Sequence, residues 1–185
     1  GCSLIYGFSG STNFYLISEN INSSEYGNVF GLVFILVGLA FKISAVPFHM
    51  WAPDVYEGSP TSVTLFFAIV PKVAALTVFI RFLYVPFINL IDQWQMIIVF
   101  ISLASMILGA VSAIGQKNLK RLIAYSSIGH MGYALAGLAV GTNSGIQSSI
   151  IYISIYLIMN LGIFCCLFMM KRKDKFFDNL EDLSG

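Results

Sequence analysis

Two long apolar runs that each carry one lysine constrain this chain most strongly. The first run extends from about residue 28 to 50 and the second from about residue 61 to 84, and a short turn joins them. Because about 20 consecutive apolar residues cross a bilayer as a helix, both runs predict membrane helices. At about 1.5 Å rise per residue, Lys42 and Lys72 lie roughly 13 Å and 16 Å from the turn, near the middle of the membrane.

A lysine at that depth costs about 2.5 to 3.5 kcal/mol on insertion scales, so it seldom persists for packing alone. Each helix also has a proline near its lysine, and Pro47 and Pro71 each leave one backbone carbonyl without its helical donor. Because an unpaired backbone group cannot face lipid, we expect both helix breaks to face protein or a water-filled cavity. The pattern predicts a polar pathway, and its alternative is two kinked helices whose lysines snorkel or form structural hydrogen bonds.

Composition places the whole chain in the membrane class, with 57% hydrophobic and only 10% charged residues. The net charge of +1 excludes a polybasic nucleic-acid binder. The sequence has no phosphate-binding loop and no dinucleotide fingerprint, and Cys2, Cys165 and Cys166 match neither a disulfide framework nor a metal-ligand spacing. We therefore expect no cofactor, no metal and no redox chemistry within this chain.

Three more apolar runs follow, and they bring the expected number of membrane helices to about five. They cover residues 94–114, 122–140 and 146–170, and the small residues Gly109 and Gly137 in them permit close helix contact. The expected fold class is an all-α polytopic membrane protein whose first helix is broken near Pro47. The expected domains are an extramembrane lead-in at 1–26, a five-helix transmembrane domain at 27–170, and a basic tail at 171–185.

The tail carries Phe176, Leu180 and Leu183 at helical spacing, which favours an amphipathic segment along the membrane interface. If the helices alternate in direction, the tail, the loop at 116–121 and residues 51–60 lie on one side of the membrane. That side carries most of the lysines and arginines. By the positive-inside rule we expect it to be the cytoplasm or the mitochondrial matrix.

Every aspartate and glutamate lies in the lead-in, a loop or the tail, so no carboxylate of this sequence reaches the depth of Lys42. Because desolvation disfavours the charged form, either a partner chain brings an acid to Lys42 or Lys42 gives up its proton. His130, about 14 Å along its helix from Arg121, lies at a similar depth, where imidazole can relay a proton or simply pack. His49 lies nearer the surface, where it gives Lys42 access to water or anchors the helix end.

Three stretches resemble a known family. They are FKISAVPFHMWAPDVYEGSPTSVT at 41–64, the pair PK at 71–72 and KRLIAYSSIGHMGY at 120–133. They closely resemble the chain 2 family of antiporter-like, proton-pumping membrane subunits of respiratory complex I, and the resemblance covers roughly residues 27 to 175. It implies the seventh to eleventh membrane helices of a fold built from two inverted five-helix repeats.

The resemblance also implies roles for individual residues. Lys42 matches the lysine of the family's broken seventh helix, Lys72 matches the shuttling lysine of the eighth, and His130 falls on the tenth. The glutamate that pairs with the first lysine, and a further pumping lysine, belong to helices outside this sequence. We therefore expect a split gene, with other complex I membrane subunits as partners, one of which supplies the missing helices and the acid for Lys42.

The expected function is proton translocation coupled to electron transfer from NADH to ubiquinone, in the lipid bilayer of the mitochondrial inner membrane. The bacterial plasma membrane is the alternative location. Two other functions stay open, namely a subunit of a multi-chain cation/proton antiporter and a non-conducting membrane scaffold.

Overall fold

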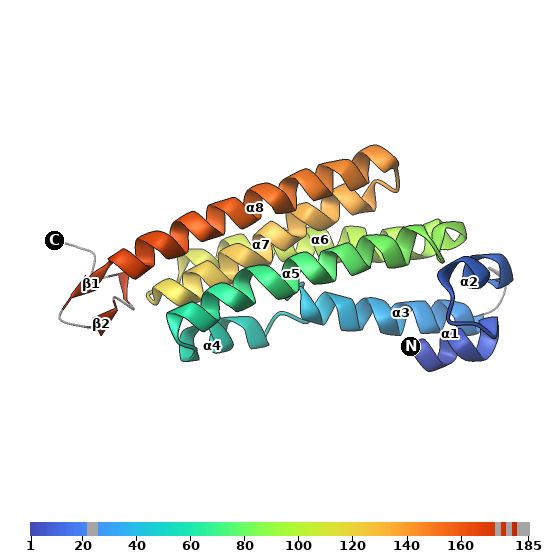
Figure 1. Cartoon of the computed structure of the whole chain (residues 1–185), viewed down its shortest axis with the longest axis horizontal. Helices are drawn as coiled ribbons and strands as arrows, with labels where there is room; N and C mark the ends of the chain where they lie inside the picture. The colour runs from blue at the N-terminus through green and yellow to red at the C-terminus, as the bar shows by residue number, and fades with distance from the viewer. Residues whose placement is uncertain (22–25, 173–174, 177–178, 181–185) are drawn as a thin grey trace.

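The structure is a computed structural model that describes residues 1–21, 26–172, 175–176 and 179–180. Long helices run side by side along one axis and form an elongated bundle (Figure 1). This arrangement confirms the all-α fold class. The long helices are α3 (Tyr26–Lys42), α5 (Thr61–Tyr84), α6 (Ile91–Ile114), α7 (Leu119–Ala139) and α8 (Asn143–Met169), and the shorter α4 (Trp51–Gly58) joins α3 to α5.

Three stretches of the described residues are long and apolar enough to cross a membrane: Thr61–Tyr84, Ile88–Ile114 and Asn143–Met169. The second of these includes a 3-10 turn, η1 (Ile88–Leu90), that leads into α6. α3 is apolar but has only 17 residues. α7 has 21 residues, and the polar stretch YSSIGH lowers its hydropathy. The second to fifth expected spans agree with α5, α6, α7 and α8 to within a few residues.

The first span ends earlier than the sequence predicts. α3 stops at Lys42 instead of continuing to Met50, because Ser44 adopts a φ of 61°, which a right-handed helix does not contain. The freed carbonyls find other donors: the Ala45 amide donates to Ala40 at 2.8 Å, and the Trp51 indole donates to Phe41 at 3.0 Å. The chain runs on from Lys42 to α4 at the end of the bundle (Figure 1), and the depth of Lys42 in a membrane stays a prediction.

The expected break at Pro71 is wrong, because α5 runs without interruption from Thr61 to Tyr84 with Pro71 inside it. Proline already has the φ angle of a helix, although it removes one donor from the ladder and its ring crowds the carbonyl four residues earlier. Membrane helices tolerate such a residue where neighbouring helices cover the freed carbonyl. Lys72 therefore lies on a continuous helix.

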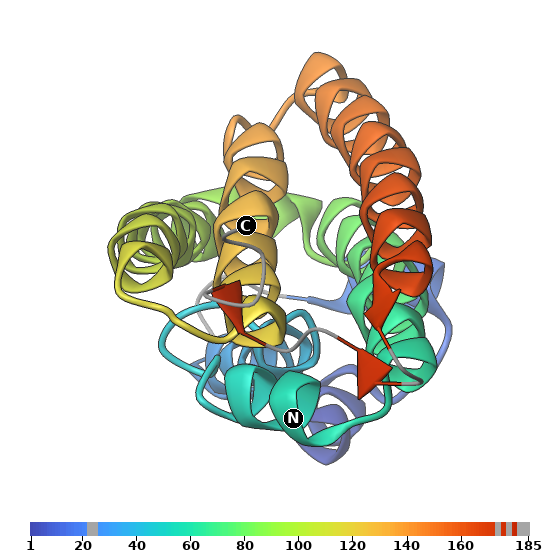
Figure 2. The same cartoon turned by 90° about the vertical axis from the view of Figure 1, so that its left-hand side faces the viewer.

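Glycine allows the long helices to approach closely, as the sequence predicts. A Cβ atom at Gly109 of α6 would lie 2.6 Å from the backbone nitrogen of Gly129 in α7. A Cβ atom at Gly137 of α7 would lie 3.0 Å from the carbonyl oxygen of Gly145 in α8. Seen along the bundle, α7 lies between α6 and α8 (Figure 2). α7 is therefore the central element of the second half of the chain.

The lead-in is more ordered than expected. It forms two short helices, α1 (Cys2–Ser9) and α2 (Phe14–Asn20), and α1 packs against α3 (Figure 1). The described part of the tail is not an amphipathic helix: β1 (Lys171–Arg172) pairs with β2 (Lys175–Phe176) in antiparallel register. A strand pairs its backbone with a neighbour, so Phe176 does not follow the helical spacing that the sequence suggested. Leu183 lies outside the described residues.

The predicted alternation of the helices is borne out where their ends meet. α4, the α6–α7 loop and the tail lie at one end of the bundle, and the α1–α2 unit lies at the other (Figure 1). At the first end, Asn118 donates to Glu57 at 3.3 Å, and the Leu180 amide donates to the Lys117 carbonyl at 2.9 Å. Which side of a membrane each end faces stays a prediction.

Candidate functional site

Lys72 is the centre of the candidate site. It is the twelfth of the 24 residues of α5, and its exposed fraction is 0%. Its ammonium nitrogen donates to the hydroxyl of Ser127 on α7 at 2.6 Å and lies 5.5 Å from the ring centroid of Tyr56 on α4. Ser127 and Tyr56 are themselves buried. A cation in this position is thus held by one hydrogen bond and one aromatic face from two different helices.

The hydroxyl of Ser127 has a second hydrogen bond, because it donates to the Ala124 carbonyl at 2.6 Å. That bond fixes the orientation of the hydroxyl, so its lone pairs are directed at Lys72. α8 closes the site from the remaining side: the phenol of Tyr156 donates to the Ala68 carbonyl at 3.0 Å, one turn before Lys72. The site is therefore built from α4, α5, α7 and α8.

A cavity between α7 and α8 leads to this site. It has a volume of about 500 Å³, and its wall includes Ser126, Ser127, His130, Tyr156 and Asn160 together with apolar side chains toward the tail end. Its polar residues lie on one stretch of α7 and the facing turn of α8. The cavity thus joins the hydrogen-bond acceptor of Lys72 to His130.

His130 is the twelfth of the 21 residues of α7 and is partly buried. Its Nδ1 atom lies 2.7 Å from the hydroxyl of Tyr152, and its ring centroid lies 5.4 Å from that of Tyr156. Ser127 precedes His130 by three residues, so the two side chains lie one helical turn apart on α7. The structure therefore brings Lys72 and His130 to one site, and their roles in proton transfer stay predictions.

Lys42, Pro47 and His49 belong to a different region. Lys42 is the last residue of α3 and is exposed. Pro47 is exposed and follows a cis peptide bond, and His49 is partly buried in the turn before α4. The Val46 amide donates to the Ser105 hydroxyl at 2.9 Å, which fastens this turn to α6. The proposed access role of His49 stays a prediction.

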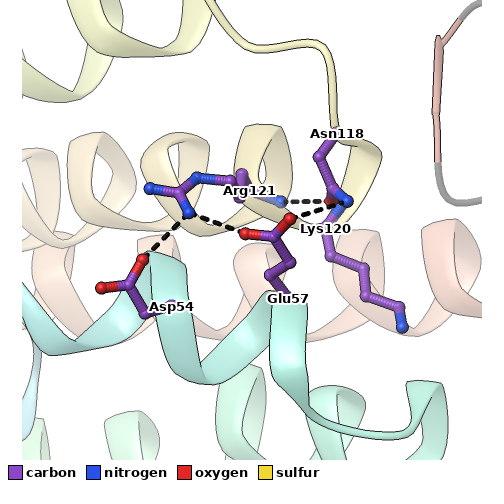
Figure 3. Close-up of polar contacts among 5 residues, drawn as sticks. All are labelled: Asp54, Glu57, Asn118, Lys120 and Arg121. Carbon is purple, nitrogen blue, oxygen red and sulfur yellow. Dashed lines mark hydrogen bonds and ion pairs between the residues drawn. The ribbon is translucent and has the colours of Figure 1, made fainter.

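The acids of the described residues that form ion pairs do so at the end of the bundle, away from both lysines. Asp54 and Glu57 pair with Arg121 at 2.9 Å and 2.7 Å (Figure 3). Within the described residues, no group of three or more His, Cys, Asp or Glu side chains could hold a metal ion.

Sequence reasoning missed several residues of the site. It did not connect Ser127 with Lys72, which the structure pairs by a hydrogen bond. It gave no role to Tyr56, Tyr152 or Tyr156. A usable signal existed, because a tyrosine inside an apolar run needs a partner for its hydroxyl, and Tyr152 and Tyr156 lie one turn apart in a largely apolar stretch.

Comparisons with known proteins agree with the resemblance seen in the sequence. Residues 1–185 match the family described as NADH:quinone oxidoreductase/Mrp antiporter, TM. The chain is 76% identical over 185 residues to NADH-quinone oxidoreductase subunit N of Pelagibacter ubique, and it covers 39% of that protein. The chain thus spans well under half the length of the curated relatives it matches.

Two solved structures have the same fold. One belongs to respiratory complex I from Thermus thermophilus with bound aureothin; it matches with a TM-score of 0.78 and 33% identity over 99% of this chain and 38% of that one. The other belongs to the Mrp complex from Dietzia sp. DQ12-45-1b; it matches with a TM-score of 0.80 and 24% identity over 88% of this chain and 30% of that one. At that identity the second likeness concerns the fold alone.

Proposed function

The chain belongs to the NADH:quinone oxidoreductase/Mrp antiporter transmembrane family, and we propose on that premise that it is part of the proton-translocating membrane arm of a respiratory complex I. One observation carries the proposal. Lys72 lies at the middle of an apolar helix, completely buried, with its ammonium group hydrogen-bonded to Ser127. An ionisable group at such a position is a functional site by default in a membrane protein.

In this proposal Lys72 takes up and releases the transported proton. Ser127 accepts a hydrogen bond from the ammonium group, and Tyr56 offers its ring face to the positive charge. When the proton leaves, the neutral amine interacts less strongly with the Ser127 hydroxyl and the Tyr56 ring than the ammonium group does. His130, one turn from Ser127 on the same cavity wall, is the next group able to carry a proton.

Lys42 has a different part in the proposal. Its exposure at the end of α3 leaves room for a carboxylate from a partner, which the described residues of this chain do not offer there. Electron transfer elsewhere in the complex alters that ion pair and thereby the charge that Lys72 experiences. We propose other membrane subunits of complex I as partners.

We propose the bacterial plasma membrane as the location, because the relatives reported above are bacterial. The mitochondrial inner membrane, which was the first expectation from the sequence, stays the alternative. This chain supplies no redox chemistry in the proposal. It acts as a membrane subunit of an NADH:quinone reductase whose electron carriers lie in other chains.

A cation/proton antiporter subunit is the second candidate, because the Mrp complex shares the fold. Co-purification with iron–sulfur and flavin subunits favours complex I, whereas sodium-dependent proton exchange favours the antiporter. A non-conducting scaffold would need dry surroundings for both lysines. Lower proton translocation in Lys72→Ala and Lys42→Ala, in the test that follows, would exclude that reading.

The test measures protons translocated per electron in inside-out membrane vesicles that carry Lys72→Ala, Lys42→Ala or the control Lys117→Ala. Lys117 is exposed in the basic loop and lies outside the site. We expect both site variants to assemble and to translocate fewer protons, and the control to match the wild type. An unchanged proton-to-electron ratio in both site variants rules out the proposal.

A further inference from the structure

α4 and α7 are joined by a group of charged and polar side chains that the proposed pathway does not use. A single nitrogen of Arg121, Nη1, donates to Asp54 Oδ1 at 2.9 Å and to Glu57 Oε2 at 2.7 Å. The other carboxylate oxygen of Glu57 accepts from Asn118 Nδ2 at 3.3 Å. Figure 3 draws these contacts, and we call Asp54, Glu57, Asn118 and Arg121 the α4–α7 clamp.

The clamp joins two helix ends whose partial charges favour it. Asn118 caps the N-terminus of α7, where its Oδ1 accepts from the amides of Lys120 and Arg121. The carboxylate of Glu57 lies beside that positive end. In the opposite sense, the ammonium group of Lys120 donates at 3.2 Å to the carbonyl of Ser59, which follows the C-terminus of α4. Charge and cap therefore favour one relative orientation of the two ends.

The same two helices provide the two contacts of Lys72. Tyr56 lies between Asp54 and Glu57 in α4, with its ring 5.5 Å from the ammonium nitrogen. Ser127 follows Arg121 by less than two turns in α7 and accepts from that ammonium at 2.6 Å. A shift of α4 against α7 moves the aromatic face and the hydroxyl relative to each other, and Lys72 lies between them.

We propose that Arg121, with Asp54 and Glu57, is a positioning residue for Lys72. It holds Tyr56 and Ser127 at the separation that the ammonium group requires, and so sets the rate at which Lys72 exchanges its proton. This inference rests on the proposed function of Lys72 and adds to it a group outside the buried site.

The clamp side chains are partly or largely exposed, so their removal can test a positioning role without unfolding the protein. The side chains of Arg121, Glu57 and Asp54 are 32%, 42% and 72% exposed. Ion pairs this exposed add little to folding stability, since water screens them and they cost side-chain entropy. Removing one should therefore leave the fold intact while it loosens the orientation of α4 against α7.

The experiment uses the intact membrane assembly in inside-out vesicles and records the amount of assembled complex and the rate of coupled proton translocation as a function of pH. We expect Arg121→Gln to assemble normally and to translocate about fivefold more slowly, the size of a single interaction between contacting residues. Its pH profile should also move. Arg121→Lys should restore most of the rate, because one nitrogen makes both contacts. Lys117→Gln, which removes a charge from the same loop, should match the wild type.

A double-mutant cycle tests whether Arg121 acts through the buried site. If the clamp acts by placing Ser127, then Arg121→Gln should have no further effect on the rate once Ser127→Ala is present. Multiplicative losses in the double variant, or a wild-type rate and pH profile in Arg121→Gln, overturn the inference. If Arg121→Gln does not assemble, Glu57→Gln takes its place in the cycle, because a glutamine keeps an acceptor for Asn118. No further effect in the Ser127→Ala background supports the inference, and multiplicative losses overturn it.

The Lys72→Ala variant separates failure of this inference from failure of the proposed function. If Lys72→Ala lowers translocation and the clamp variants do not, Arg121 has no positioning role and the function stands. If Lys72→Ala has no effect, the proposed function fails and the inference fails with it.

Discussion

Lys42 and Lys72 are the same feature of the sequence, a lysine in an apolar run with a proline nearby, yet they lie in opposite surroundings. Lys72 is completely buried, with Ser127 as its hydrogen-bond acceptor and the ring of Tyr56 close to its ammonium group. Lys42 is the last residue of its helix and is exposed. The described residues thus give Lys72 a hydrogen-bond acceptor and an aromatic neighbour, and they leave Lys42 at an exposed helix end.

The difference arises from where the backbone leaves the helix. α5 continues through Pro71, which keeps Lys72 on the helix face that meets Ser127 of α7 and Tyr56 of α4. α3 ends five residues before Pro47, where Ser44 turns the chain with a positive φ. A proline thus indicates the region of a helix break without deciding whether or where the break occurs.

The largest effect we expect concerns the close contact that places α7 beside Lys72. In Gly109→Val, the Cβ atom of the valine would lie 2.6 Å from the backbone nitrogen of Gly129, which is too close for two packed atoms. The helices must separate, and overpacking of this kind costs about 1 to 3 kcal/mol or more. The measurement is the midpoint temperature of heat-induced dissociation of the detergent-solubilised assembly.

The matched control is Gly115→Val, because Gly115 follows the same helix and has no atom within 4 Å of its Cβ position. If Gly109→Val and Gly115→Val lower the midpoint temperature equally, the packing of α6 on α7 does not hold the Lys72 site.

A smaller effect is expected from Ser127→Ala, which leaves the buried ammonium group without its acceptor. An unsatisfied buried polar group costs about 1 to 3 kcal/mol. Ser154→Ala is the control, since Ser154 is exposed and, among the described residues, donates to the Ile150 carbonyl of its own helix. The same midpoint temperatures measure both. Equal values for the two variants would mean that Lys72 does not depend on Ser127.

The smallest effect concerns the turn beyond Lys42. The indole of Trp51 lies 5.6 Å from the ring of Phe41 and donates a hydrogen bond to the Phe41 carbonyl. Trp51→Phe keeps an aromatic ring at this position but removes the donor. One such hydrogen bond is worth about 0.5 to 1.5 kcal/mol, and the exposed setting favours the lower end. A midpoint temperature identical to the wild type contradicts a capping role for Trp51.

Much of the fold could be predicted from the sequence. The apolar runs located α5, α6, α7 and α8 to within a few residues, because a bilayer sets the length of a spanning helix. Glycines at 109 and 137 indicated where helices approach, and the basic loops indicated which ends lie together. The sequence placed Arg121 on the same side of the membrane as Asp54 and Glu57. It did not predict that the arginine pairs with these two carboxylates.

The sequence by itself determined which residues are ionisable inside apolar helices, since hydropathy and periodicity depend only on neighbours along the chain. Tertiary structure alone decided that Ser127 accepts from Lys72, that α3 ends at Lys42, and that the α4–α7 clamp exists. The contacts of Lys72 and of the clamp join segments that lie tens of residues apart, such as Lys72 and Ser127. The turn that ends α3 is local, but its bond from the Val46 amide to Ser105 of α6 is long-range as well. The burial of a side chain depends on such contacts, so it cannot be read from one stretch of sequence.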